Sequence, residues 1–400
     1  MFILIIVLFA LTYVQSQNWI IQNSGTSSPL YSVCFPKSDT GYAAGVTPGI
    51  GSGLILKTTN GGTTWDSLSI GMWVPINSIF FTDANTGYAV GGSQYPSWVG
   101  IILKTTDGGI TWNNWNPGLI HPLVSVQFPD KNTGYAVGFG SIFKTTNAGS
   151  TWNNLPYLPT ETLWSVFFTD SINGFTVGED GYILKTTNGG ADWTIQNTGT
   201  SHALTSVYFA DSNTGYVVGD AGTILKTTNG GTNWIAQTFG TYSVLHSVYF
   251  TDTITGYAVG DSGIILQTPD GGANWIRQTS PALGLSSICF PNSDTGYTVG
   301  ANGIILKTTN GGGVGVNENY ITSQFIKTYP NPAIDKITIE VSEQSTNGNL
   351  SILNLNGQEL FQQTVTKHST MIDITTLPIG VYFLRLINNK QVQVGKIIKE

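Results

Sequence analysis

Residues 224–234 read I-L-K-T-T-N-G-G-T-N-W, and close copies of this box recur through residue 312. The third position of the box is occupied by Lys57, Lys104, Lys144, Lys185, Lys226, Gln267 and Lys307. A glycine followed by an aromatic residue precedes each box, with the ring at Tyr42, Tyr88, Tyr135, Phe175, Tyr216, Tyr257 and Tyr297. Seven copies of both elements indicate seven structural units, because self-similarity at a fixed period marks a repeat architecture.

Each unit holds four short apolar runs, as the sixth one illustrates. These runs are S-V-Y-F at 247–250, G-Y-A-V-G at 256–260, G-I-I-L-Q-T at 263–268 and N-W-I-R-Q at 274–278. They are rich in β-branched and aromatic residues and are bounded by turn residues, which is typical of strands. The pair Asn229-Gly230 favours a tight hairpin with positive φ at both residues, so we expect the last two strands to pair antiparallel.

Four strands in each period of 40 to 47 residues are typical of a propeller blade. We therefore expect an all-β chain whose main domain is a seven-bladed β-propeller. The seventh box stops at Gly311-Gly312 and lacks its Trp, while residues 18–22 (N-W-I-I-Q) read like residues 233–237 (N-W-I-A-Q). The N-terminal strand should thus complete the last blade and close the ring, which removes an open sheet edge.

The box resembles the Asp-box of sialidase and BNR-type repeats, and more closely the repeats of photosystem II assembly factor-like propellers. The likeness covers residues 18–312. The family's Asp appears at Asp107 and Asp270, and is Asn in the other boxes: Asn60, Asn147, Asn188, Asn229 and Asn310. The resemblance implies that this residue caps its own turn. It implies a fold rather than an activity, because such boxes occur in proteins with unrelated functions.

The two ends of the chain indicate export. Residues 2–14 are apolar but too few to span a bilayer, and Val14-Gln15-Ser16 suits signal peptidase, so we expect a signal peptide at 1–16. The propeller then occupies 17–312, a linker 313–324, and a second all-β domain 325–400. No membrane span is expected in the mature protein.

The second domain resembles the type A C-terminal sorting domain of the type IX secretion system. The matching residues are Tyr329-Pro330-Asn331-Pro332, the Asn356-Gly357-Gln358 hairpin, the 377–382 stretch around Gly380, and the 395–400 ending with Lys396. The resemblance implies a small immunoglobulin-like β-sandwich, the secretion machinery as partner, and delivery through the periplasm to the cell surface or medium. The alternative is an adhesive immunoglobulin-like module.

Charge and cysteines narrow the possibilities. Residues 17–316 contain 16 acidic and 9 basic residues, and six of the nine basic residues are box lysines, so no basic stripe remains for nucleic acid.

Cys34 and Cys289 hold the same position in units one and seven, which ring closure makes neighbours. We expect two small buried thiols, about 8 Å apart and beyond disulfide reach. A disulfide that locks the ring is the alternative.

No catalytic motif stands out. A sialidase is excluded because it needs an arginine cluster, and the chain has only Arg277 and Arg385. Five acids precede the Gly-aromatic pairs at one offset and should form turns: Asp83, Asp130, Asp170, Asp211 and Asp252. The four histidines show no metal-ligand spacing, so we expect no metal, no cofactor and no enzyme. A secreted glycoside hydrolase of Asp-box type is the alternative, because two facing carboxylates would suffice for it.

One position differs in every unit, and it directly precedes the S-[VI]-x-F strand. It is occupied by Tyr31, Asn77, Val124, Trp164, Thr205, His246 and Ser286. We also expect aromatic residues that no box requires to lie near this position. They are Trp73, Trp115, Tyr157 and Tyr242, together with Tyr95 and Trp98 in a blade-two insertion. We expect Tyr31, Asn77, Trp164, His246, Trp73, Trp115 and Trp98 to form a recognition face for a protein or glycan. Drift at unconstrained positions is the alternative interpretation.

Overall fold

The computed structural model describes residues 19–49, 51–68, 70–93, 98–115, 121–155, 161–237, 239–312, 326–341, 348–354, 358–387 and 392–400. The signal peptide predicted at 1–16 and the linker predicted at 313–324 lie outside these ranges. The chain divides into two units, Met1–Gly315 and Val316–Glu400.

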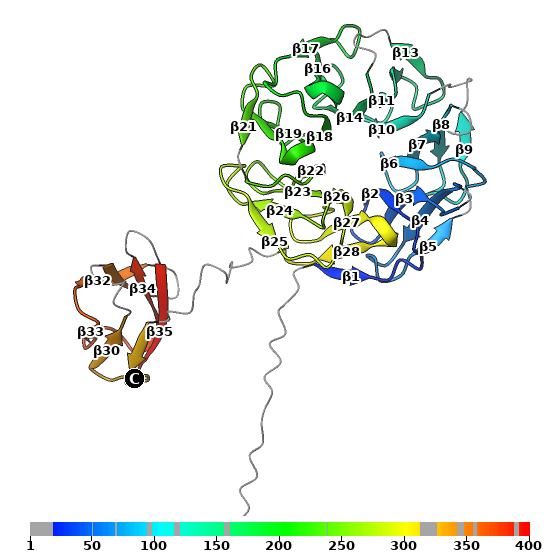
Figure 1. Ribbon diagram of the computed structural model, residues 1–400. Coiled ribbons are helices and arrows are strands. Elements are labelled where there is room, and N and C mark those ends of the chain that lie inside the picture. The colour runs from blue at the N-terminus through cyan, green and yellow to red at the C-terminus, as the bar shows by residue number, and fades with distance from the viewer. Residues whose placement is uncertain are drawn as a thin grey trace, which may run out of the picture. The chain divides into compact units, whose positions relative to one another are not determined.

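The first unit is a ring of sheets, as Figure 1 shows; its described part contains seven four-stranded antiparallel sheets. The first four blades are β2 (Leu30–Cys34), β3 (Gly41–Val46), β4 (Gly53–Thr58), β5 (Asp66–Leu68); β6 (Ile76–Phe81), β7 (Gly87–Ser93), β8 (Val99–Thr105), β9 (Asn113–Trp115); β10 (Leu123–Gln127), β11 (Gly134–Gly138), β12 (Ser141–Thr145), β13 (Asn153–Leu155); and β14 (Leu163–Phe168), β15 (Gly174–Gly178), β16 (Ile183–Thr186), β17 (Thr194–Gln196). The other three are β18 (Leu204–Phe209), β19 (Gly215–Gly219), β20 (Ile224–Thr227), β21 (Ile235–Gln237); β22 (Leu245–Phe250), β23 (Gly256–Gly260), β24 (Ile265–Thr268), β25 (Ile276–Gln278); and β26 (Leu285–Cys289), β27 (Gly296–Gly300), β28 (Ile305–Thr308), β1 (Ile20–Gln22). Short 3-10 turns follow the second strand in three blades: η1 (Glu179–Gly181), η2 (Asp220–Gly222) and η3 (Ala301–Gly303).

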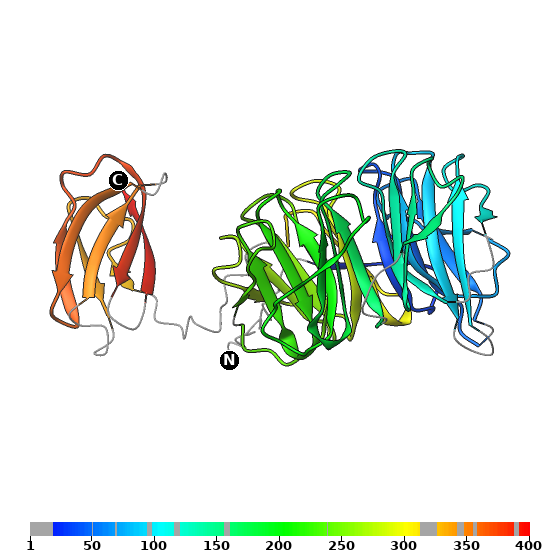
Figure 2. The same cartoon turned by 90° about the horizontal axis from the view of Figure 1, so that it is seen from above.

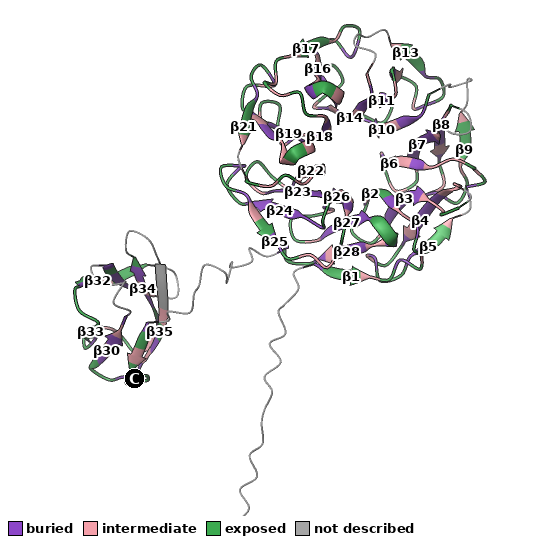
Figure 3. Ribbon diagram, viewed as in Figure 1, coloured by how far each residue is buried: buried purple, intermediate pink, exposed green. Residues whose placement is uncertain are grey.

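Burial decreases from the middle of each blade to its rim. Figure 2 shows the ring from its edge, with the strands of each blade side by side. The second strands are buried along their whole length, as in β23, or up to their last residue, as in β3 and β7, because a neighbouring blade covers each face. The outermost strands, such as β21, are short and mostly exposed, and they appear green in Figure 3. This gradient explains the continuous apolar runs of the second strands.

The N-terminal strand completes the last blade. β1 pairs antiparallel with β28, which places Ile20 opposite Lys307 and Gln22 opposite Ile305. Trp19, directly before β1, is fully buried. The predicted closure of the ring by the N-terminus is confirmed.

Three aromatic rings recur at each seam between blades. The ring of the Gly-aromatic pair stacks on the Phe that ends or follows the next blade's first strand, and that blade's box Trp meets the Phe edge-on. Tyr216 stacks on Phe250 with ring centroids 3.8 Å apart, and Trp275 approaches Phe250 edge-on at 6.2 Å. Trp19 takes the position of the missing box Trp, edge-on to Phe290. Such offset and edge-on pairs add to the stabilisation from burial itself.

The box lysine joins neighbouring blades. Lys226 Nζ donates to the Gly271 carbonyl oxygen at 2.6 Å, and the Tyr216 hydroxyl donates to the same oxygen at 2.7 Å. Each lysine bonds the equivalent carbonyl of the next blade: Lys57 to Gly108, Lys104 to Ala148, Lys144 to Gly189, Lys185 to Gly230, Lys226 to Gly271 and Lys307 to Gly61. The last of these contacts joins blade seven to blade one. The lysines are therefore committed to the scaffold.

A ring of serines connects the innermost strands. Each serine Oγ accepts a hydrogen bond of 3.2 to 3.4 Å from a backbone N–H of the next blade. The pairs are Ser32 with Ile79, Ser78 with Val126, Ser125 with Val166, Ser165 with Val207, Ser206 with Val248, Ser247 with Ile288, and Ser287 with Val33. The series runs around the whole ring and fixes the blades at the channel.

The box hairpin differs from the expected tight turn. β20 and β21 do pair antiparallel, but seven residues, 228–234, connect them. Positive φ occurs at Gly230 and Gly231, and not at Asn229. Asn229 instead accepts the N–H of Asn233 through its side-chain oxygen at 3.0 Å. The expectation of positive φ at Asn229 was wrong. The connection is longer than a two-residue turn, and the Asn229 side chain caps it by accepting a backbone N–H.

The two cysteines are free thiols on neighbouring innermost strands. Cys34 ends β2 and Cys289 ends β26, and both are free thiols as expected, but they are partly exposed, so the expected full burial was wrong. Burial raises the pKa of Cys34 to about 11. Burial likewise raises the pKa of Cys289, and the nearby Cys34 adds to that effect.

The second unit contains two sheets that share one core. One sheet has the order β29 (Lys327–Tyr329), β30 (Lys336–Glu340), β33 (Ser369–Asp373); the other has the order β32 (Glu359–Val365), β31 (Gly348–Leu353), β34 (Gly380–Ile387), β35 (Val392–Lys399). Ile337 from the first sheet and Ile352 and Leu384 from the second are fully buried in the same cluster. The specific likeness to an immunoglobulin fold stays a prediction.

Candidate functional site

The seven positions that vary between repeats share one structural location. Each is the second residue of an innermost strand. At each of them the pairing with the second strand shifts register, as between Leu245 and Ser247 on either side of His246. The extra residue at such a shift is left out of the ladder, so the sheet does not depend on its side chain. This explains why the position varies while its neighbours hardly change.

All seven side chains line one cavity of about 820 Å³ at the channel end where the innermost strands begin. We call this site the variable mouth and define it by Tyr31, Asn77, Val124, Trp164, Thr205, His246 and Ser286. Its volume lies within the range of small-ligand and peptide-side-chain pockets. Of the residues singled out in the sequence, the cavity brings together Tyr31, Asn77, Trp164 and His246.

One side of the variable mouth is aromatic. Trp164 meets Phe139 edge-on at a centroid distance of 6.0 Å, and both rings line the cavity. Trp98 meets the same Phe139 at 5.7 Å and His121 at 5.4 Å. We call Trp98, Phe139 and Trp164 the aromatic arc. Trp98 of the blade-two insertion contacts Phe139 but is not among the residues that line the cavity, so its role in recognition stays a prediction, and Tyr95 lies outside the described residues.

The blades that follow bring carboxylates to the mouth. Glu179 begins η1 and Asp220 begins η2, directly after the last glycine of a second strand, and Asp261 holds the same place in the sixth blade. Glu179 and Asp220 line the cavity. We call these three residues the acidic arc. Within the described part of the chain, the side chains of Glu179 and Asp220 have no hydrogen bond or ion pair.

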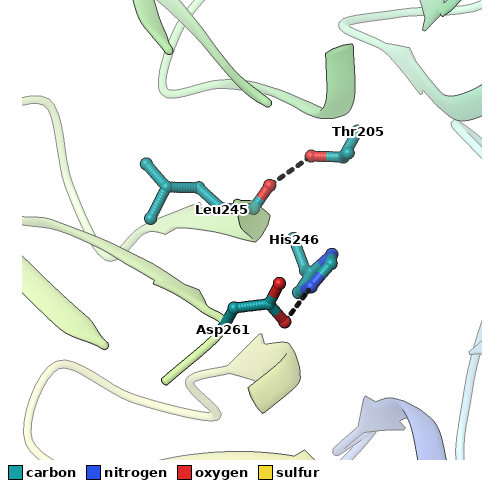
Figure 4. A network of polar contacts seen from close by, with 4 residues as sticks. All are labelled: Thr205, Leu245, His246 and Asp261. Atoms are coloured by element: carbon teal, nitrogen blue, oxygen red, sulfur yellow. Dashed lines mark hydrogen bonds and ion pairs between the residues drawn. The ribbon is translucent and has the colours of Figure 1, made fainter. Parts of the chain in front are cut away.

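Two polar contacts hold the blade-six side of the mouth, as Figure 4 shows. His246 Nε2 lies 2.9 Å from Asp261 Oδ1. Thr205 Oγ1 donates a hydrogen bond to the Leu245 carbonyl oxygen, which crosses from one blade to the next. On the opposite side, Asn77 Nδ2 donates to the Leu123 carbonyl oxygen at 2.8 Å. One N–H of Asn77 and the hydroxyl of Thr205 are therefore engaged within the ring.

Two other tryptophans of the expected face lie away from the mouth. Trp73 is 74% exposed and borders a separate hollow of about 340 Å³ with Ile70 and Met72. Trp115 ends the outermost strand β9 and packs against the core between blades two and three. The expectation that they lie next to the mouth was wrong, because the repeated sequence does not determine on which side of a blade a loop residue lies. Tyr157 is outside the described residues.

The repeated turn acids act as expected. Asp83 Oδ1 accepts the N–H groups of Asn85 and Thr86, both at 2.8 Å. These hydrogen bonds lower the pKa of Asp83. The equivalent acids accept the same pair of N–H groups: Asp130, Asp170, Asp211 and Asp252. Each holds a turn and is not available as a catalytic group.

In the second unit, the sorting motif contacts the final strand. Tyr329 ends β29, and Asn331 Nδ2 donates to the carbonyl oxygen of Lys396 in β35 at 2.8 Å. Asn331 Oδ1 accepts the N–H of Ile398 at 2.9 Å. Gly380 begins β34, opposite Lys399 of β35. The Tyr329-Pro330-Asn331-Pro332 segment thus contacts the C-terminal strand through Asn331, whereas Asn356 and Gly357 lie outside the described residues.

Two sequence families match the chain. Residues 11–154, 157–239 and 234–316 match the family described as photosynthesis system II assembly factor YCF48. Residues 327–400 match the family described as secretion system C-terminal sorting domain. Among curated proteins, no sequence matches this chain. Within the described residues, no helix is long and apolar enough to cross a membrane.

Solved propellers share the fold at low identity. A YCF48 protein with a bound D1 peptide has 22% identity and a TM-score of 0.61, over 73% of this chain and 97% of the other. YCF48 from Cyanidioschyzon merolae has 22% identity and a TM-score of 0.60, over 72% and 98%. PorZ, an essential surface component of the type IX secretion system of Porphyromonas gingivalis, has 13% identity and a TM-score of 0.55, over 90% of this chain and 58% of the other. These likenesses establish the fold alone.

The matched sequence families go further than the structural likeness. The propeller match covers more than half of the chain, and the terminal match covers residues 327–400 of the second unit. The chain belongs to the YCF48 family of β-propellers and carries a C-terminal sorting domain that directs it through a type IX secretion system to the cell surface or beyond.

Proposed function

We propose that this protein is an exported recognition propeller without catalytic activity, and that it holds a segment of another surface protein in the variable mouth. One observation carries the proposal: the position that differs in all seven repeats lines the same cavity in each of them. A surface that only drifted would have no reason to gather Trp164, Phe139 and two carboxylates around one opening.

The repeated side chains in the rest of the ring already make contacts within the fold, which supports this assignment. The box lysines are bonded to carbonyls of neighbouring blades, and the turn aspartates are bonded to backbone N–H groups. The box tryptophans are packed into the seams, as Trp275 is against Phe250. The variable mouth therefore combines a cavity, partly exposed aromatic rings and unengaged charges, which are the features of a binding site with aromatic anchors.

A protein segment is the ligand class that we favour over a glycan. A YCF48 protein of the same fold has been solved with a D1 peptide bound, so this type of propeller accommodates peptides. A cell-surface destination gives access to other exported proteins. The anchors in the mouth, above all Trp164, are of the residue type that dominates protein interfaces.

The alternative function is a secreted glycoside hydrolase. Such an enzyme needs two carboxyl groups that flank the scissile bond from different sides. Glu179 and Asp220 occupy equivalent turns of adjacent blades, so both approach the mouth from one side of the ring. The aromatic arc adjoins them at blade four, and the described cavity lining contains no carboxylate from the other side of the ring. This arrangement favours binding over hydrolysis.

The test compares Trp164→Ala with Trp73→Ala in the purified full chain. Both remove a partly or largely exposed tryptophan, but only Trp164 lines the mouth. Captured surface proteins and a glycan array are the probes, and bound partners are measured quantitatively. We expect Trp164→Ala to weaken capture by about 2 kcal/mol or more, as an interface hot spot does, and Trp73→Ala to have no effect.

Thermal unfolding provides the control. Loss of the edge-on contact with Phe139 should cost Trp164→Ala only about 0.5–1.5 kcal/mol of stability. Equal capture by wild type and Trp164→Ala, or equal loss in both variants, contradicts the proposal. Turnover of a glycan by the wild type would favour the hydrolase instead.

A further inference from the structure

The variable mouth has two chemically different walls. The aromatic arc comes from blades two, three and four, and the acidic arc comes from blades four, five and six. The two walls meet at blade four, which supplies both Trp164 and Glu179 to the cavity. A ligand seated there touches aromatic faces and carboxylates at the same time.

The charge of the mouth is unbalanced. Asn77 and Thr205 already donate to carbonyls of the ring. Glu179 and Asp220 are acceptors only when ionised, and neither has a side-chain partner in the described part of the chain. No lysine or arginine is among the described residues that line the cavity. The mouth thus offers two carboxylates without a cationic partner, beside neutral donors such as Tyr31 and Ser286.

This imbalance selects among ligands. A neutral glycan would bring no positive charge to the two carboxylates. Phosphorylated or carboxylated ligands would meet like charge. Lysine and arginine side chains are pure donors with a positive charge. Arginine in addition stacks on aromatic faces and pairs with carboxylates through two parallel hydrogen bonds, which suits a mouth with both walls.

We propose that the variable mouth recognises an exposed protein segment by an arginine or lysine side chain, which lies between the aromatic arc and the carboxylates of Glu179 and Asp220. The proposal rests on the proposed function, because it identifies the ligand of the same cavity. Asp261 is engaged with His246 and adds negative charge to the same side. The acidic excess of the propeller, 16 acids against 9 bases in residues 17–316, steers a basic segment toward it.

Dye-labelled peptides of one length and one flanking sequence test the inference, with a central pair of Arg-Arg, Lys-Lys, Gln-Gln or Glu-Glu. Their dissociation constants for the full chain are measured by fluorescence anisotropy at low and high salt. We expect the Arg-Arg peptide to bind most tightly, followed by Lys-Lys, and the neutral and acidic peptides to bind at least about tenfold more weakly, as the loss of a charge-assisted pair implies.

Two double variants separate local recognition from overall charge. Glu179→Gln with Asp220→Asn removes two charges at the mouth. Asp39→Asn with Asp66→Asn removes two exposed charges elsewhere in the propeller. The first double variant should weaken Arg-Arg binding by about tenfold or more, and the second by less than about twofold. Both fold as wild type if their unfolding transitions coincide with it.

Several results overturn the inference. These are equal weakening by the two double variants, equal binding of all four peptides, absence of Arg-Arg binding, or displacement of the bound ligand by a neutral oligosaccharide. The proposed function fails separately, when Trp164→Ala leaves capture of every ligand unchanged. A neutral ligand lost in Trp164→Ala and kept in Glu179→Gln with Asp220→Asn would retain the recognition mouth and reject its basic specificity.

Discussion

Trp19 meets Phe290 edge-on, with ring centroids 6.0 Å apart and ring planes at 86°, although the two residues stand at opposite ends of the propeller sequence. The indole N–H of Trp19 donates to Gln278 Oε1 at 2.7 Å. Gln278 donates in turn to Gln267, whose amide reaches the Gly311 carbonyl oxygen. The N-terminal strand is therefore inserted into the last seam by packing and by a polar chain, and does not merely lie along an edge.

We expect Trp19→Ala to lower the free energy of unfolding by about 3–5 kcal/mol, because it removes a fully buried ring and leaves a cavity. Chemical denaturation of the purified protein measures this loss. Ile20→Thr is the matched control in the same strand, since Ile20 is 56% exposed, and it should change stability by no more than about 0.5 kcal/mol. Equal stability of Trp19→Ala and Ile20→Thr would show that the ring closes without this contact.

Two substitutions test the box lysine, and one of them, Gln, already occurs at this position as Gln267. The other, Lys226→Met, removes the bond from Nζ to the Gly271 carbonyl oxygen. Since Tyr216 donates to the same oxygen, the loss should be about 1 kcal/mol. Lys226→Gln should be milder, because Gln267 bonds the equivalent Gly311 in blade six. Denaturation curves that rank Lys226→Gln below Lys226→Met would disprove the scaffold role given to this position.

The capping aspartate predicts a pH effect. Hydrogen bonds from Thr111 and Thr105 lower the pKa of Asp107 from its ordinary value of 3.8 to about 2. A carboxyl with a lowered folded-state pKa stabilises the fold above its unfolded pKa, and this contribution is lost as the pH falls toward the folded value. Asp107→Asn keeps the accepting oxygen, as Asn147 does in blade three, but does not titrate.

Wild type should therefore lose more stability than Asp107→Asn as the pH is lowered from about 5 to about 2. Unfolding free energies measured across this range give the comparison. The turn aspartates such as Asp83 titrate in both proteins and cancel. Parallel curves for the two proteins would mean that the hydrogen bonds to Asp107 do not stabilise its ionised form in the folded protein.

The cysteines should be present as unreactive thiols. Burial raises the pKa of Cys34 to about 11 and also raises that of Cys289, so little thiolate forms at neutral pH. We expect slow alkylation by iodoacetamide in the native protein and fast alkylation after unfolding. A non-reduced mass lower by two hydrogens, with no alkylation even after unfolding, would establish the ring-locking disulfide instead.

The scaffold was predictable because its contacts are made by residues that recur in every repeat. The box Trp, the box Lys and the Gly-aromatic ring each meet the same partner at every seam, so seven copies describe one interface. The match of residues 18–22 to 233–237 even identified Trp19 as the missing member. Closure of the ring required no information beyond this pattern.

The mouth was predictable only in part. The sequence shows that Tyr31, Trp164 and His246 vary, but the register shift that frees them is a property of the backbone. It arises where the second strand passes close to the chain before the first strand: a Cβ at Gly260 would overlap the Val244 carbonyl oxygen. Glu179 and Asp220 look like ordinary turn residues until the ring brings adjacent blades to one cavity.

The most direct measurement of the central claim, that the variable mouth meets the partner, is site-specific photo-cross-linking in cells with a working type IX system. The photoreactive p-benzoyl-phenylalanine replaces Ser286, which lines the mouth and belongs to neither arc. The control site is Ile254, an exposed residue in the turn at the other end of the β22 and β23 strands. The account predicts a discrete adduct from position 286, lost in Trp164→Ala, and none from position 254. Adducts from position 254 without any from position 286 would contradict it.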